Sequence, residues 1–190
     1  GPIQFPLLIA GLFGALIGSF LNVCIYRLPR LESIAWPGSH CPRCTHPIAW
    51  YDNIPIVSYV VLAGQCRHCG VRIPFRYPMV EILNALGYVG LFWFFGPSWA
   101  TAAYGLLYSA LLVVAGTDLS HKIIPNAVTF PGIIVGLVCA ATVLPLGILD
   151  SILGVLVGGG ILWLLAWASP YLFGKEGMGG GDIKLLAMIG

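Results

Sequence analysis

Five apolar runs, each close to the length of a membrane-spanning helix, constrain the fold of this chain more than any other feature. A helix needs roughly 20 apolar residues to cross a bilayer. Charged residues make up only 8% of the chain, whereas soluble domains contain about 25%, so lipid is the expected solvent for the apolar surface. We predict an all-α polytopic membrane protein with helices at Phe5–Tyr26, Met79–Phe95, Trp99–Thr117, Ala127–Leu144 and Ser151–Ala168.

A sixth apolar run opens at Ile183 and continues to the last residue. It is too short to cross a bilayer, so we expect a longer helix and further C-terminal helices in the full protein. A cleaved signal peptide is the alternative for the first run, but no basic region precedes that run and no small-residue cleavage site follows it. The expected parts are a first transmembrane helix at 1–26, a small cytoplasmic domain at 27–78, and a transmembrane domain at 79–190 that lacks its C-terminal helices.

The basic residues indicate the orientation. They follow the first, third and fifth runs, whereas the N-terminus and the loops 96–98 and 145–150 contain no lysine or arginine. Under the positive-inside rule, the stretch 27–78 and the ends of the helices that carry Asp118 and Asp182 face the cytoplasm, and the N-terminus lies outside. The basic residues are Arg27, Arg30, Arg43, Arg67, Arg72, Arg76, Lys122, Lys175 and Lys184.

Two cysteine pairs in the polar stretch predict a structural zinc site. Cys41 and Cys44 form one C-x-x-C pair, and Cys66 and Cys69 form the other. Each pair places two thiolates on one tight turn, and two such turns complete a tetrahedral zinc site with no open position. A reducing cytoplasm argues against the alternative of disulfides; unmetallated or redox-active thiols are a further alternative.

The roles of the other histidines and cysteines are less clearly indicated by the sequence. Histidines at three positions are alternative ligands, although we expect them to be solvated or to surround the cysteines; they are His40, His46 and His68. Cys24 and Cys139 fall within apolar runs, where we expect them to act as small packing residues.

Two aspartates at helix ends are the candidate catalytic groups. Asp118 ends the third run, and Asp182 begins the sixth directly after Gly179, Gly180 and Gly181. These helices run in opposite directions, so both carboxyl groups are expected at the same membrane surface. Two adjacent carboxyl groups can share one proton and act as base and acid on a peptide bond, and the glycines let an extended substrate approach. The alternative is that Asp182 caps a helix and Asp118 ends a span.

The chain resembles the type IV prepilin peptidases, the bifunctional leader peptidase and N-methyltransferase family. The similar stretches run in family order and are Gly18–Pro29, the two cysteine pairs, Asp52–Pro55, Arg76–Glu81, Asp118–Asn126 and Gly177–Lys184. The resemblance implies that Asp118 and Asp182 are catalytic, the second within a G-x-G-D motif, and that the four cysteines match the family's cysteine tetrad.

The resemblance also implies the reaction and its place. The family cleaves the basic leader of type IV prepilins and type II secretion pseudopilins at the cytoplasmic face of the bacterial inner membrane, after a glycine and usually before a phenylalanine. It then methylates the new amino group with S-adenosylmethionine. Gly64 matches a glycine associated with methylation, although Gln65 replaces a basic residue of many relatives.

Further methylation candidates are the polar residues Asp52, Asn53 and Glu81. The alternatives are that the first two are turn residues and that Glu81 is a charge in the first turn of a helix. The stretch 27–78 contains no glycine pattern typical of nucleotide binding, so S-adenosylmethionine is implied by the resemblance alone.

Two other functions compete with proteolysis. One is a membrane-anchored zinc module that recruits a partner without proteolysis. The other is a cation transporter, which is disfavoured because both acids fall at the membrane surface. The expected partners are a prepilin or pseudopilin and the lipid bilayer, without nucleic acid. The small-residue faces Gly14–Gly18 and Gly154–Gly158 favour packing within the helix bundle, with a homo-oligomer as the alternative.

Overall fold

The computed structural model describes residues 4–144, 147–173 and 179–190, so the predicted loop residue Lys175 lies outside the described part. The described residues are helical, with isolated β-bridges and no strand. In chain order, the elements are α1 (Gln4–Arg27), η1 (Leu28–Arg30), η2 (Trp50–Asn53), α2 (Val57–Val61), α3 (Arg76–Phe95), α4 (Trp99–His121), α5 (Asn126–Thr142), α6 (Ile148–Phe173) and α7 (Gly180–Ile189).

Four helices are long and apolar enough to cross a membrane. They lie at Gln4–Arg30, Arg76–Phe95, Trp99–His121 and Ile148–Ser169. The helix in the fourth predicted run, α5, has 17 residues, which is at the lower limit for a span. These helices confirm the predicted all-α membrane fold.

By its internal contacts, the chain divides into two compact units at residues 1–113 and 114–190. The division falls inside α4. The candidate zinc ligands belong to the first unit, and both candidate catalytic aspartates belong to the second.

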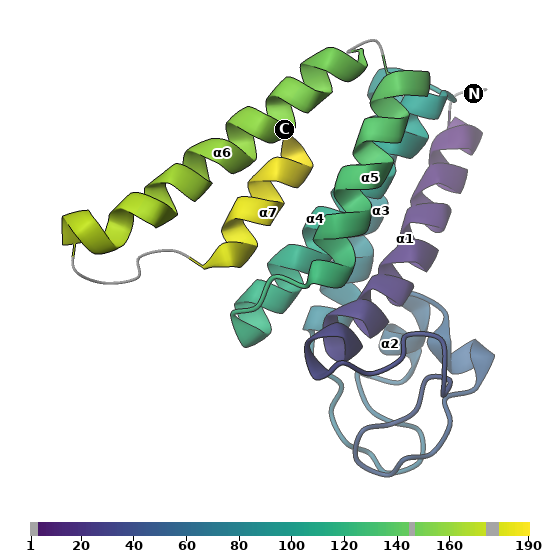
Figure 1. Cartoon of the computed structure of the whole chain (residues 1–190). Helices are drawn as coiled ribbons and strands as arrows, with labels where there is room; N and C mark the ends of the chain where they lie inside the picture. Colours follow the sequence, from purple (N-terminus) through teal and green to yellow (C-terminus); the bar gives the residue numbers. More distant parts are fainter. Residues whose placement is uncertain (1–3, 145–146, 174–178) are drawn as a thin grey trace. The chain divides into compact units, whose positions relative to one another are not determined.

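In the first unit, α1 and α3 pack side by side (Figure 1) through the small-residue face Gly14–Gly18. A Cβ atom on Gly14 would lie 2.9 Å from Ala85 Cα, and one on Gly18 would lie 2.7 Å from Glu81 Cα. These distances are shorter than van der Waals contact, so the two backbones approach closely only because both α1 positions are glycine.

Buried polar side chains also hold this unit together. Asn84 is fully buried, and its Nδ2 donates to the carbonyl of Gly14 at 2.7 Å. Its Oδ1 accepts from the hydroxyl of Ser109 in α4 at 3.0 Å. In an apolar environment such interhelical bonds satisfy groups that lipid cannot, so they fix the register of α1, α3 and the first part of α4.

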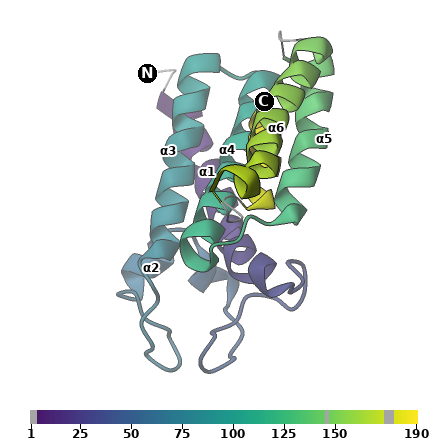
Figure 2. The same cartoon turned by 60° about the vertical axis from the view of Figure 1, so that its left-hand side comes forward.

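Between α1 and α3, residues 28–75 form a polar lobe with two loops that lie side by side (Figure 2). The lobe contains few buried apolar residues. The fold of these loops therefore depends on groups other than a hydrophobic core.

In the second unit, α7 runs antiparallel to α6 along a glycine face (Figure 1). A Cβ atom on Gly158 would lie 2.8 Å from the carbonyl oxygen of Leu186, and one on Gly159 would lie 3.1 Å from Ala187 Cβ. On the other side of α7, the Met188 side chain occupies the space above Gly132 of α5. Glycines on two helices thus hold α7, and the predicted Gly154–Gly158 face is used within the bundle.

Candidate functional site

The four predicted zinc ligands form one cluster. The Sγ atoms of Cys41, Cys44, Cys66 and Cys69 all lie within 4.8 Å of one another, and those of Cys41 and Cys69 are 3.8 Å apart. A tetrahedral zinc site with Zn–S bonds of about 2.3 Å requires S–S edges of about 3.8 Å. All six cysteines are free, so the disulfide alternative is not observed.

The two cysteine turns share one backbone geometry. In the first turn, the N–H of Thr45 donates to the carbonyl of Cys41 at 2.9 Å, and in the second turn the N–H of Gly70 donates to the carbonyl of Cys66 at 2.9 Å. Thr45 and Gly70 both have positive φ, at 57° and 66°. This repeated turn directs two thiols from each loop toward the same point, as a structural zinc site requires.

The thiols of this cluster differ in acidity. Backbone N–H groups of Cys44 and Arg43 and neighbouring thiols stabilise the Cys41 thiolate and, against burial, lower its pKa to about 6. The backbone N–H of His46 favours the Cys44 thiolate, but burial and the neighbouring thiols outweigh it and raise the pKa of Cys44 to about 11. A divalent cation would bring all four groups to the thiolate form. The donor set therefore fits zinc.

The nearby histidines lie outside the sulfur cluster. The rings of His46 and His68 contact each other with centroids 3.5 Å apart and planes tilted by 36°, and Nδ1 of His40 lies 3.1 Å from the carbonyl of Gly38. Among the described residues, the only group placed to hold a metal ion consists of the four cysteines.

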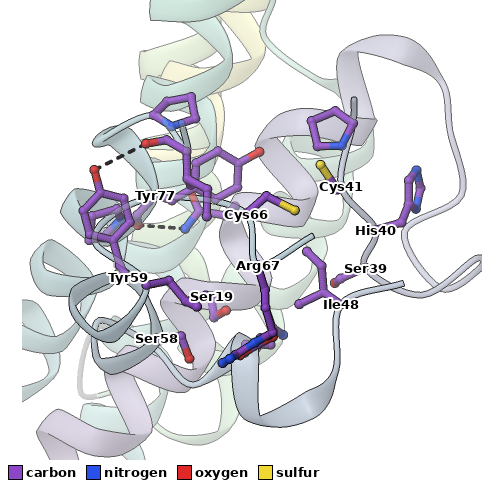
Figure 3. Close-up of a pocket in the computed structure, with 18 of the residues that line it drawn as sticks. Ser19, Ser39, His40, Cys41, Ile48, Ser58, Tyr59, Cys66, Arg67 and Tyr77 are labelled. Carbon is purple, nitrogen blue, oxygen red and sulfur yellow. Dashed lines mark hydrogen bonds and ion pairs between the residues drawn. The ribbon is translucent and has the colours of Figure 1, made fainter. Parts of the chain in front are cut away.

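A cavity of about 350 Å³ lies in the first unit, between the polar lobe and the adjoining ends of α1 and α3 (Figure 3). Cys41 and Cys66 contribute to its lining, so the cysteine cluster borders it. Three of the four methylation candidates, Asp52, Asn53 and Glu81, also line it. Ligand sites commonly have volumes of about 300–1,000 Å³, so this cavity has the size of a small-molecule site.

The fourth candidate, Gly64, contributes indirectly. It has φ of +66°, and a Cβ atom on it would lie 2.9 Å from the ring of Tyr59. Tyr59 lines the cavity, and its hydroxyl donates to the carbonyl of Ile73 at 3.3 Å (Figure 3). Gly64 therefore provides both a turn and the space into which this tyrosine packs.

An ion pair lies in the cavity wall. Arg67 donates from Nε and Nη2 to the two oxygens of Asp52, at 2.7 and 2.6 Å. The hydrogen bonds and the charge of Arg67 lower the pKa of Asp52. Because Asp52 lies in η2 and Arg67 lies in the second cysteine turn, this bidentate pair connects two segments of the lobe.

Glu81 is buried, with 8% of its surface exposed. It lies in the second turn of α3, and its Oε2 accepts from the backbone N–H of Ile56 at 2.7 Å. The alternative that Glu81 is a charge in the first turn of this helix is therefore wrong. Sequence reasoning missed its neighbour Asn22, although a single amide within an apolar run and within the similar stretch Gly18–Pro29 is a detectable signal.

In the second unit, Asp118 lies in the last turn of α4 and is partly exposed. The helix continues to His121, slightly beyond the predicted end. The backbone N–H of Lys122 donates to the carbonyl of Asp118 at 2.8 Å, and Lys122 has φ of 55°. This left-handed residue closes the helix, and α5 begins only a few residues later at Asn126.

Asp182 lies in the first turn of α7 and is exposed. Gly179 is the N-cap, and its carbonyl accepts from the N–H of Asp182 at 3.1 Å. The carboxylate of Asp182 turns toward Gly179, whose added Cβ would lie 3.7 Å from Oδ2. The helix start therefore presents this carboxylate in an exposed position beside backbone that carries no side chain.

Direct contacts bring the start of α7 to the loop that follows Asp118. A Cβ atom on Gly181 would lie 2.9 Å from Ile124 Cβ. Nζ of Lys184 donates to Oδ1 of Asn126 at 2.9 Å and lies 5.1 Å from the ring centroid of Phe130. The residues before and after Asp182 are thus held against the segment that joins α4 to α5, which places the two aspartates on adjoining elements.

The comparisons with known proteins cover both units. The model of the bacterial peptidase A24 N-terminal domain matches residues 12–95, and that of the type IV leader peptidase family matches residues 105–190. No solved structure matches the chain.

Similar proteins carry the name prepilin leader peptidase/N-methyltransferase. One from Pseudomonas aeruginosa is 38% identical over 94% of this chain and 70% of its own length. One from Myxococcus xanthus is 40% identical over 97% of this chain and 56% of its own length. One from Neisseria gonorrhoeae is 35% identical over the whole chain and 74% of its own length.

Proposed function

Since the chain belongs to the type IV leader peptidase family, we propose that it is a membrane aspartic endopeptidase that cleaves the basic leader of type IV prepilins or pseudopilins and then methylates the new N-terminus. The observation that carries the proteolytic part is the contact between Gly181 and Ile124. It brings the residue next to Asp182 against the loop that follows Asp118. The names of the relatives support both activities.

Peptide cleavage by this pair follows from the behaviour of two neighbouring carboxyl groups. In this proposal Asp118 and Asp182 act on the peptide bond together, one as an ionised base and the other as a protonated acid. The ionised group takes a proton from a water molecule, which attacks the peptide carbonyl, and the protonated group donates to the carbonyl oxygen.

The leader approaches on the cytoplasmic side of the inner membrane in this proposal. The described basic residues lie in the lobe, at the adjoining ends of α1 and α3, and within a few residues of the two aspartates, which supports an N-terminus outside and an active site inside. Asp182 is exposed at the start of α7, and among the described residues no atom lies within 4 Å of a Cβ added to Gly180. Gly180 therefore leaves room for an extended peptide backbone.

The polar lobe supports methylation in this proposal. Zinc bound by the four cysteines would hold its two loops together, and it has no open position for catalysis. S-adenosylmethionine supplies an activated methyl group when bound. Transfer to the new α-amino group of the pilin would break the bond between the methyl carbon and sulfur, release S-adenosylhomocysteine and leave the amine to lose a proton.

The test of proteolysis compares three variants of the detergent-solubilised protein on a purified prepilin. Asp118→Asn and Asp182→Asn each remove one ionisable group without changing side-chain volume, and each is expected to abolish leader cleavage. Asp150→Asn changes an exposed acid in the first turn of α6 and is expected to cleave like the wild type.

The competing zinc module predicts the opposite pattern. In that case neither aspartate variant affects activity, while loss of the cysteines abolishes partner binding. Retained cleavage in both aspartate variants, with intact insertion and zinc content, would therefore refute the aspartic mechanism.

A further inference from the structure

Asn22 presents a buried oxygen that has no hydrogen-bond partner within the described residues. The side chain is 2% exposed and lines the cavity of the first unit. Its Nδ2 donates to the carbonyl of Tyr77 at 2.9 Å and lies 3.4 Å from the carbonyl of Gly18. Two carbonyl partners fix the nitrogen on that side, so the unsatisfied atom is Oδ1, an acceptor.

Glu81 supplies a second acceptor beside it. On α3, Glu81 lies one helical turn after Tyr77, and the carbonyl of Tyr77 accepts a hydrogen bond from Asn22. On α1, Ser19 lies one turn before Asn22, and its hydroxyl hydrogen-bonds to Glu81. The pairs Ser19–Asn22 and Tyr77–Glu81 therefore face each other across α1 and α3. Both acceptors line the same cavity.

The partners that the structure gives Glu81 are the N–H of Ile56 and the hydroxyl of Ser19, and neither carries a positive charge. Buried polar groups are almost always hydrogen-bonded, and buried charges are almost always paired. An orphaned oxygen next to a buried carboxylate therefore indicates a ligand that brings a positive charge or N–H donors.

The rest of the cavity indicates what kind of ligand this is. Its volume of about 350 Å³ is in the range of small-molecule sites. Tyr26, Tyr59 and Tyr77 are among its lining residues, and aromatic faces attract cations and stack with flat rings. Arg72 is exposed and also lines the cavity, so a carboxylate on the ligand has a partner too.

We propose that this cavity binds S-adenosylmethionine, with Oδ1 of Asn22 and the carboxylate of Glu81 holding a cationic group of that ligand. The inference rests on the proposed methyltransferase activity. Of the two substrates of that activity, the methyl donor combines a sulfonium, an ammonium, a carboxylate and a flat purine in one small molecule. The other substrate, a polypeptide with a free α-ammonium and usually a phenylalanine ring, offers no carboxylate at that end for Arg72.

The first test measures binding of radiolabelled S-adenosylmethionine to the solubilised protein by equilibrium dialysis. Glu81→Gln keeps an oxygen for the N–H of Ile56 and gains an amide that can donate to Ser19, so the local structure is retained while the charge is lost. A hydrogen bond to a charged group is worth at least a tenfold change in affinity. We therefore expect Glu81→Gln to weaken binding at least tenfold.

The matched control is Glu32→Gln, which removes an exposed carboxylate of the same lobe that does not line the cavity and is expected to leave affinity unchanged. Zinc content and prepilin cleavage serve as folding controls for both variants. Unchanged affinity in a folded Glu81→Gln protein overturns the proposal. So does a result in which Glu81→Gln weakens only the binding of a processed pilin peptide.

The second test needs no substitution. Ultraviolet crosslinking of the labelled methyl donor to the wild-type protein, followed by peptide mapping, is expected to place the label within residues 19–27 or 52–81. Label confined to residues 114–190 overturns the proposal. Both tests measure binding directly, so a protein that binds the donor but does not cleave prepilin contradicts the proposed protease and leaves the cavity assignment standing.

Discussion

Replacing Gly181 by alanine is expected to damage cleavage more than stability. The new Cβ would lie 2.9 Å from Ile124 Cβ, about 0.5 Å closer than the shortest ordinary contact. Ile124 Cβ is attached to the backbone, so the loop after Asp118 or the start of α7 must move. Overpacking costs about 1–3 kcal/mol, and alanine gains about 1 kcal/mol over glycine in a helix. The unfolding free energy should therefore fall by only about 0–2 kcal/mol.

The displacement acts directly on the residue next to Asp182. A shift of about 1 Å in a catalytic group can reduce the rate about a hundredfold, so a shift of half that size is expected to lower kcat for prepilin cleavage by about tenfold or more.

Gly136, inside α5 of the same unit, is the matched control for this substitution. Among the described residues no atom lies within 4 Å of a Cβ added there, and alanine gains helix propensity in the same way. Gly136→Ala should therefore cleave prepilin at the wild-type rate. Wild-type kcat in Gly181→Ala, or an equal loss in both variants, would show that this contact does not position the site.

Two further predictions concern the polar lobe. Cys69→Ser should release zinc and make residues 28–75 sensitive to proteolysis, because a structural metal contributes directly to folding. The control Cys139→Ser, in α5, should keep the metal. Atomic absorption measures the zinc content of both variants. Gly64→Ala should reduce S-adenosylmethionine binding while leaving prepilin cleavage unchanged, because its Cβ would push the ring of Tyr59 toward the cavity. The control Gly70→Ala has the same φ of +66° but open space around its Cβ, so it tests backbone strain without a clash. An equal loss of S-adenosylmethionine binding in Gly64→Ala and Gly70→Ala would show that contact with Tyr59 is not the cause.

The membrane helices were predictable because each depends on local composition alone. Apolar runs of about 20 residues have few alternatives in a chain with so little charge, and the structure has α1, α3, α4 and α6 close to the predicted positions. The cysteine cluster was predictable for a related reason. Two C-x-x-C pairs carry a short-range geometry, and a tetrahedral site restricts how the two turns can meet.

The cavity was less predictable because its lining comes from distant segments. Asn22 and Tyr77 are joined by a hydrogen bond across 55 positions of the sequence, and nothing near Asn22 in the sequence indicates that partner. Similarly, the sequence placed Asp118 and Asp182 at helix ends, but the connection between those ends comes from contacts such as those of Ile124 and Asn126 with α7. Pairings of this kind depend on helix packing rather than on local pattern.

Both units use glycine in the same way beside their polar groups. In the first unit, Gly18 packs against the backbone of Glu81 itself, with an added Cβ 2.7 Å from its Cα. In the second unit, Gly181 packs beside Asp182. A side chain attached to a closely packed backbone has its origin fixed by the helix contact, so only its own rotation remains free. Small residues at these contacts therefore position an ionisable group more tightly than a loop could, and this accounts for the difference between the tight Gly181 and the open Gly180 within a single glycine run.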